Sequence, residues 1–185
     1  NLSAQPLNNL GQNPGTAFPV CGTDTFTQGS VPICGGKSVP GPCPNTVLAD
    51  LNPFWYKFTC FAAGSLGFVS APVNSTDDYD WQLFDVTNKD PANLYTDVSM
   101  FVACDWSGES GNTGASAAGT SLQHCDGYGV PLLSSMPTLI EGHQYILRVS
   151  HFSGSSQSGY ALTYARGSAQ RNDPVDSPFF TRRSP

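Results

Sequence analysis

The chain consists of short segments in which hydrophobic and polar residues alternate, separated by clusters of glycine, proline, asparagine and serine. No segment carries hydrophobic residues at helical spacing over the roughly ten residues that a stable helix needs. The alternating segments are residues 53–60, 65–70, 79–86, 99–104, 138–140, 144–152 and 160–165. Short strands at regular intervals with turns between them predict an all-β fold, a jelly-roll-like antiparallel β-sandwich. The turn at Ala63-Gly64 predicts that the first two strands form a hairpin.

The alternation also predicts which side chains share a face of a strand. In residues 79–86, Trp81 and Leu83 fall on one face, while Asp80 and Gln82 fall on the other. In residues 144–152 one face carries Tyr145, Leu147, Val149 and His151. We therefore expect these two strands to bury the face that carries the large apolar side chains.

Composition excludes several classes of protein. Charged residues make up 12% of the chain, against roughly 25% in ordinary soluble domains, and the formal net charge is −6. Because a nucleic-acid-binding protein usually presents a basic face, we expect no nucleic-acid partner. Hydrophobic residues make up 39% of the chain, enough for a substantial core. No apolar run approaches the roughly 18 residues of a membrane span, so none is expected.

The six cysteines indicate a disulfide-stapled, exported protein. Our preferred pairing joins Cys104 to Cys125 around a Gly/Ser-rich loop, Cys34 to Cys43, and Cys21 to Cys60, although six cysteines allow about 15 pairings. Zinc is a weak alternative, because no CxxC pair is present and His124 has no partner at zinc-finger spacing. The chain starts at Asn1 rather than methionine, and we interpret this as removal of a signal peptide. The expected location is extracellular, at the cell surface.

Three regions are expected along the chain. Residues 1–20 are polar and punctuated by prolines, which predicts an extended lead-in. Residues 21–165 form the sandwich domain. Residues 166–185 contain four of the eight basic residues together with three prolines, which is typical of a linker or tail.

Acidic residues concentrate in the middle of the chain. Asp77, Asp78 and Asp80 lie in one turn-rich segment, and calcium prefers carboxylate and carbonyl oxygens from such loops. The spacing is not that of an EF-hand. Calcium is therefore a possible cofactor, and the alternative is that these carboxylates are solvated and hydrogen-bond backbone amides in turns.

Two aromatic residues flank the loop between Cys104 and Cys125, each beside an aspartate and a glycine. Trp106 and Tyr128, with Asp105 and Asp126, are the residue types that build sugar-binding surfaces, in which rings stack on the apolar faces of sugars and polar groups bind hydroxyls. The alternative is that the two rings cover a small core of the loop itself.

Signatures of catalysis are weak. No serine lies in a GxSxG motif, and the Gly-rich residues 107–119 lack the Lys-Ser/Thr ending of a phosphate-binding loop. The three histidines fall in dissimilar contexts, and His151 fits a partly buried, hydrogen-bonded residue better than a base. A glycosidase with two facing carboxylates is the alternative that the acidic residues leave open. We expect a protein that is not an enzyme.

Four motifs resemble a known family: Asn52-Pro-Phe-Trp-Tyr-Lys-Phe-Thr-Cys-Phe61, Asp77-Asp-Tyr-Asp-Trp-Gln-Leu-Phe-Asp-Val86, Phe101-Val-Ala-Cys-Asp-Trp-Ser-Gly-Glu109 and Ser134-Ser-Met-Pro-Thr-Leu-Ile-Glu-Gly-His-Gln-Tyr145. They resemble a module near the start of large gliding-motility-associated adhesins, which are exported by the type IX secretion system. More distantly, Asp78-Tyr-Asp80 and the segments 145–149 and 159–163 are similar to the prepeptidase C-terminal domain, a β-sandwich. The resemblance spans about residues 15–165 and implies no catalytic residues.

The sequence therefore predicts a non-catalytic extracellular adhesion module that binds a glycan or a surface protein through loops such as 104–129. The alternative function is a structural subunit of a filament or surface layer, which associates with its own copies through extended termini.

Overall fold

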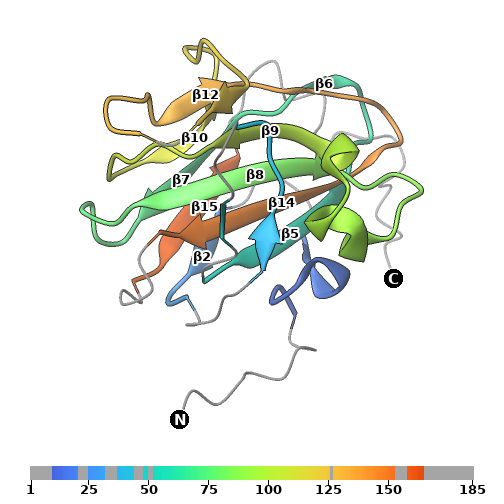
Figure 1. Cartoon of the computed structure of the whole chain (residues 1–185), viewed down its shortest axis with the longest axis horizontal. Coiled ribbons are helices and arrows are strands. Elements are labelled where there is room, and N and C mark those ends of the chain that lie inside the picture. Colours follow the sequence, from blue (N-terminus) through green and yellow to red (C-terminus); the bar gives the residue numbers. More distant parts are fainter. Residues whose placement is uncertain are drawn as a thin grey trace, which may run out of the picture.

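The computed structural model describes residues 10–20, 25–31, 37–43, 48–49, 52–125, 127–152 and 158–164. Two β-sheets stack face to face, and short 3-10 helices lie against the outer side of one of them (Figure 1). The all-β sandwich predicted from the sequence is confirmed. Among the described residues no helix is long and apolar enough to cross a membrane.

The first sheet, here sheet A, has six strands in the order β1-β5-β14-β8-β9-β11. Their bounds are β1 Phe18–Pro19, β5 Phe54–Thr59, β14 Gln144–His151, β8 Tyr79–Asp85, β9 Phe101–Asp105 and β11 Gln123–His124. The central pairs are antiparallel, whereas the edge strands β1 and β11 pair in parallel with their neighbours. The sheets are therefore mixed at their edges rather than antiparallel throughout.

The second sheet, here sheet B, has five strands in the order β12-β10-β7-β15-β2. Their bounds are β12 Leu133–Ser135, β10 Thr113–Ser116, β7 Phe68–Pro72, β15 Tyr160–Tyr164 and β2 Phe26–Gln28. Two small ribbons complete the strands, β13 Thr138–Leu139 with β6 Gly64–Ser65, and β3 Ser38–Val39 with β4 Leu48–Ala49. The 3-10 helices are η1 Pro14–Thr16, η2 Pro91–Tyr95 and η3 Val98–Met100.

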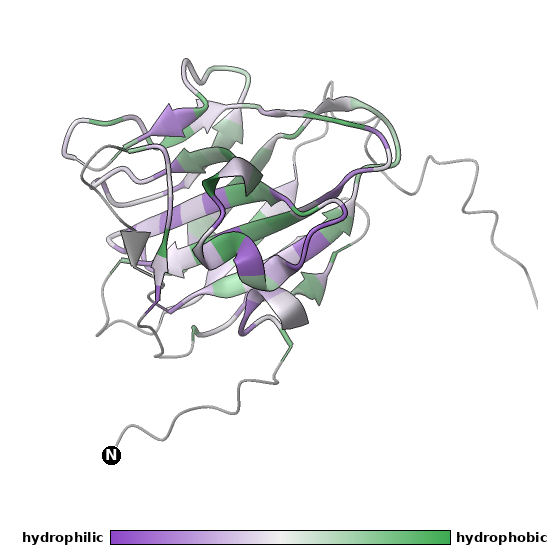
Figure 2. Ribbon diagram, turned by 45° about the vertical axis from the view of Figure 1, so that its right-hand side comes forward, coloured by the Kyte–Doolittle hydropathy of each residue, from purple (hydrophilic) through white to green (hydrophobic). Residues whose placement is uncertain are grey.

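The core lies between the two sheets and follows the period-two pattern of the sequence. Trp81 and Leu83 are fully buried there, and so are Leu147 and Val149 on the neighbouring strand β14. Hydrophobic residues concentrate along the strands, and the connections are mostly neutral or hydrophilic (Figure 2). The predicted inward faces of residues 79–86 and 144–152 are confirmed.

The predicted hairpin of residues 53–60 and 65–70 is wrong. β5 pairs with β1 and β14 in sheet A, whereas β7 belongs to sheet B and pairs with β10 and β15. Between them the chain forms β6, which pairs with β13. The turn at Ala63-Gly64 thus begins a crossover between the sheets. β5 and β7 both pair with strands that are distant in sequence and not with each other.

The outer face of sheet A is covered rather than solvated. A second apolar cluster joins this face to η2, η3 and the residues near η1 and β3; it comprises Ala17, Val39, Trp55, Phe84, Val86, Leu94, Met100 and Ile146. Asp80 and Gln82 point outward as predicted, yet both are buried. The backbone at Gly41 lies over the side chain of Gln82 and helps to bury it. A Cβ atom added at Gly41 would lie 3.3 Å from Nε2 of Gln82.

Residues 10–20, which the sequence assigns to an extended lead-in, are part of the folded body. The backbone N–H of Trp55 donates to the carbonyl of Gly11, and Ala17 is fully buried. Residues 1–9 and the whole tail 166–185 lie outside the described residues.

Candidate binding surface at one end of the sandwich

The disulfide network differs from the predicted one. Cys43 is bonded to Cys125, so the predicted pairs Cys104 with Cys125 and Cys34 with Cys43 are both wrong. The reason is the register of β9 and β11, which places Gln123 opposite Cys104 and leaves Cys125 two residues further along. Cys104 keeps a free, buried thiol. The predicted pair Cys21 with Cys60 involves Cys21, which lies outside the described residues.

Trp106, predicted to be an exposed sugar-stacking residue, is only 2% exposed. Its ring packs against Gly41, where an added Cβ atom would lie 2.6 Å from Cη2 of the indole. Cys43, Cys104 and Trp106 form one small apolar cluster beside the disulfide. The prediction for Trp106 is therefore wrong, and the core that buries it includes Gly41 and Cys43, so it is not the core of the loop itself that the alternative expected.

Asp105, the second predicted sugar contact, is also buried and is hydrogen-bonded inside the protein. Its Oδ2 lies 3.0 Å from Nδ1 of His124 and 3.0 Å from the hydroxyl of Ser134. Burial raises the pKa of the Asp105 carboxyl, although the hydrogen bonds from His124 and Ser134 act in the opposite direction. Because β9 and β11 belong to sheet A and β12 to sheet B, these three side chains tie the two sheets together.

Although the three residue types are those of a catalytic triad, their arrangement differs from one. In a triad the histidine uses one ring nitrogen for the nucleophile and the other for the carboxylate. Here Nδ1 of His124 faces both groups, 3.0 Å from Asp105 and 3.4 Å from Ser134. The hydroxyl of Ser134 is fully buried and also lies 2.8 Å from the carbonyl of Cys104. This geometry suits a structural role, in which the three side chains hold the two sheets together.

Asp77 and Asp80 of the expected calcium segment have different surroundings. Oδ2 of Asp77 lies 3.6 Å from Nε2 of His151, and both residues are buried. Asp80 pairs with Ser150 on the outer face of sheet A, whereas Asp78 is half-buried. Within the described part of the chain, no three His, Cys, Asp or Glu side chains gather in a way that would hold a metal ion.

The connections at one end of the sandwich are joined to one another by hydrogen bonds. The N–H of Gly108 donates to the carbonyl of Gly127 at 3.0 Å, and the hydroxyl of Ser107 donates to the carbonyl of Val130 at 2.6 Å. The N–H of Gly129 donates to Oε1 of Glu109 at 2.7 Å. The β9–β10 connection therefore holds the β11–β12 connection at three points.

Further bonds extend this network to the neighbouring connections. The N–H of Gly111 donates to the carbonyl of Asp77 in the β7–β8 connection, at 3.1 Å. The N–H of Phe152, at the end of β14, donates to the carbonyl of Asp78 at 3.0 Å. We call the described residues of these connections, 73–78, 106–112, 125, 127–132, 152 and 158–159, the loop end.

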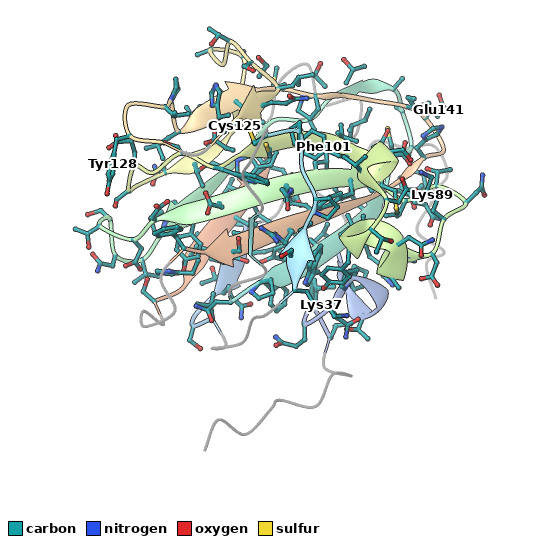
Figure 3. The ribbon with its side chains drawn as sticks, viewed as in Figure 1. Lys37, Lys89, Phe101, Cys125, Tyr128 and Glu141 are labelled. Atoms are coloured by element: carbon teal, nitrogen blue, oxygen red, sulfur yellow. A yellow bond between two sulfur atoms is a disulfide. The ribbon has the colours of Figure 1, made fainter. Side chains whose placement is uncertain are left out.

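Tyr128 stands at the tip of the loop end. Its side chain is 91% exposed, the highest value among the described large hydrophobic residues, and it projects from the side of the molecule opposite Glu141 and Lys89 (Figure 3). Gly129 has a φ of 80°, a left-handed conformation that favours glycine and closes the turn behind the ring. Tyr128 is the predicted sugar contact that the structure places on the surface, and Asp126 lies outside the described residues.

Glu109 was not singled out by the sequence, although it contacts the backbone beside Tyr128. The available signal was weak. Gly108-Glu109 and Gly127-Tyr128-Gly129 are both small, polar turn segments, and their contact depends on the pairing of β9 with β11.

No protein-family model, curated protein or solved structure matches the chain.

Proposed function

We propose that the chain is a non-catalytic extracellular binding module that recognises a glycan through the loop end. The observation that carries the proposal is the exposure of Tyr128, at 91%, on a turn whose backbone is fixed by neighbouring loops. The flat apolar face of an aromatic ring matches the apolar face of a sugar ring, and the tyrosine hydroxyl adds a hydrogen-bonding group.

The rigidity of the turn supports this function. Gly127, Gly129 and Val130 each contribute a backbone group to a hydrogen bond with the β9–β10 connection. Binding therefore orders little additional chain, and a preorganised surface loses less conformational entropy when the ligand arrives. Elsewhere in the loop end, the exposed side chains of Asn74 and Thr76 carry polar groups of the kind that bind sugar hydroxyls.

A non-catalytic role is consistent with the buried polar groups. The carboxylate, imidazole and hydroxyl of Asp105, His124 and Ser134 bond to one another and are withdrawn from solvent. Of the other two histidine–aspartate contacts, that between Nδ1 of His143 and Oδ2 of Asp85 at 2.6 Å lies at the opposite end of the sandwich, and that between His151 and Asp77 is buried.

The proposed location rests on three observations: the disulfide between Cys43 and Cys125, the low charge content, and the resemblance of four motifs to adhesins of gliding bacteria. A surface-exposed adhesion module exported by type IX secretion is the most specific form of the proposal. The alternative, a subunit that assembles through its termini, depends on residues 1–9 and 166–185, and residues 10–20 already pack on their own domain.

A glycan array tests the proposed function. Tyr128→Ala should reduce the binding of any recognised glycan about threefold to tenfold, the worth of one aromatic stacking contact, with stability changed by less than about 0.5 kcal/mol. Phe61→Ala is the matched control, because Phe61 is also an exposed aromatic residue, at 42%. It follows the end of β5 that lies away from the loop end. Absence of glycan binding by the wild type, or equal loss in both variants, would refute the proposal.

A further inference from the structure

The outer face of sheet A carries a row of side chains that are completely buried although some of them are polar. Four side chains lie next to one another on β5, β14, β8 and β9, each opposite the next in the strand register: Trp55, Arg148, Gln82 and Cys104. None of the four is exposed. In the described part of the chain, neither Nε2 nor Oε1 of Gln82 has a hydrogen-bond partner, and the indole nitrogens of Trp55 and Trp106 have none either.

Residues 37–43, which we call the strap, cover this row. The strap crosses sheet A between Lys37 and the neighbourhood of Cys125 (Figure 3). Gly41 of the strap lies over Gln82 and Trp106, since an added Cβ atom would be 3.3 Å from the amide and 2.6 Å from the indole. At the end of the strap, Cys43 belongs to the same apolar cluster as Cys104 and Trp106.

Hydrogen bonds do not hold the strap on the sheet. Its strand β3 pairs with β4, and no hydrogen bond between described residues joins the strap to sheet A. Pro40 and Pro42 also lack the backbone N–H that an amide oxygen beneath them would need. On sheet A the strap is therefore held by the packing of buried residues such as Val39 and by the disulfide between Cys43 and Cys125.

These features act in opposite directions. Apolar packing and the disulfide favour a closed strap, whereas the partnerless polar atoms of Gln82 and Trp106 favour an open one, because water then satisfies them. We propose that the Cys43–Cys125 disulfide is a redox-controlled latch, and that its reduction lets the strap lift from sheet A while the rest of the sandwich stays folded. This inference does not depend on the glycan-binding function proposed above.

The latch opens by thiol–disulfide exchange with a dithiol reductant. Cys125 is partly exposed, whereas Cys43 is 5% exposed, so a thiolate of the reductant attacks the sulfur of Cys125. Cys43 leaves as a thiolate and takes up a proton. The second thiolate of the reductant then displaces Cys125 from the mixed disulfide, and Cys125 is protonated in turn. Two electrons and two protons have then passed to the protein, and the dithiol has become a cyclic disulfide.

Labelling of Cys104 with iodoacetamide tests the latch, because Cys104 lies in the covered row. The chain is reduced with dithiothreitol under native conditions, the reductant is removed by gel filtration, and each cysteine peptide is followed by mass spectrometry. Cys60 is the internal control, because it is 1% exposed and lies in the core between the sheets, which the strap does not cover. In the reduced chain Cys104 should be labelled at least about tenfold faster than Cys60.

The other outcomes overturn the inference. Equal labelling rates of Cys104 and Cys60 would show that the disulfide stabilises the whole domain rather than the strap. No labelling of Cys104 in the reduced chain would show that the strap stays closed without the bond.

Two variants test the opposing forces. Gln82→Met removes the partnerless amide at similar length, so Cys104 in the reduced chain should be labelled about tenfold more slowly than in the wild type. Gly41→Ala forces a Cβ atom against the indole of Trp106 and should speed the labelling, whereas at the control Gly29→Ala an added Cβ atom meets nothing within 4 Å. Labelling of Gln82→Met as fast as the wild type, or equal rates in the two alanine variants, would contradict the latch.

Discussion

Oε1 of Glu109 accepts a 2.7 Å hydrogen bond from the backbone N–H of Gly129, so a side chain in the β9–β10 connection fixes the turn that carries Tyr128. The two residues are 20 positions apart in the chain. Their contact exists because β9 and β11 pair in parallel and deliver both connections to the same end of sheet A.

Glu109→Ala should loosen this turn without unfolding the domain. An exposed hydrogen bond to a charged group contributes about 1 kcal/mol, so the free energy of unfolding should fall by no more than that. Hydrogen exchange should quicken at the amides of residues 127–130. Glu109→Gln retains the acceptor and serves as the control, and equal exchange in the two variants would show that the bond does not hold the turn.

Asp105→Ala should cost far more stability. It leaves the buried imidazole of His124 and the hydroxyl of Ser134 without their shared carboxylate, and breaking a buried network of this kind costs about 2 to 4 kcal/mol. Urea denaturation measures the change, with Glu141→Ala as an exposed control. A loss below about 1 kcal/mol would contradict the role of Asp105 as a tie between the sheets.

The Cys43 to Cys125 disulfide should appear in a non-reducing peptide map as a cross-link between the fragments that contain these two residues. A cross-link between Cys104 and Cys125 would contradict the structure. Because the bond joins residues 82 positions apart, the chain-entropy model gives a loss of about 4.5 kcal/mol on its removal as an upper limit. Cys43→Ser, Cys125→Ser and the double variant should lose similar amounts, because each removes the same bond.

Cys104 should be unreactive in the folded protein. Burial, followed by the nearby carboxylate of Asp105, raises the pKa of its thiol to about 12. Iodoacetamide at pH 8 should leave Cys104 unlabelled in the native state and label it in denaturant, as read by mass spectrometry of its peptide. Rapid native labelling would contradict the burial.

The same thiol makes stability depend on alkaline pH. The folded chain keeps Cys104 protonated up to about pH 12, whereas an ordinary thiol ionises near 9.0. Ionisation therefore favours the unfolded chain, and stability should fall as the pH rises above 9 towards 12. Cys104→Ala should show a shallower decline over this range, and an identical decline would contradict the assignment.

The strands and their faces follow from the sequence because period-two alternation is a local signal. Trp81 and Leu83 face the core, and Asp80 and Gln82 face outward, as the alternation of these four residues predicts. The pairing of the strands does not follow from this local signal. Nothing near Ala63-Gly64 indicates that the chain changes sheets there, since the partners of β5 and β7 come from residues far along the chain.

The candidate site was predictable only in part for the same reason. Asp-Trp-Ser-Gly around Trp106 has the composition of an exposed turn, but Gly41, 65 positions earlier, covers the indole. Tyr128 has no such cover and remains on the surface. Cys125 likewise pairs with Cys43 and not with Cys104 because residues 37–43 pass over sheet A, and their path is not a local feature of the sequence.

The most direct test of the account is a hydrogen-exchange footprint of the wild-type chain with the saccharide that binds most tightly. The account predicts protection confined to the loop end, at residues 107–111 and 127–130. Unchanged exchange there, with protection on the opposite side of the molecule around Lys89 and Glu141 instead, would contradict it.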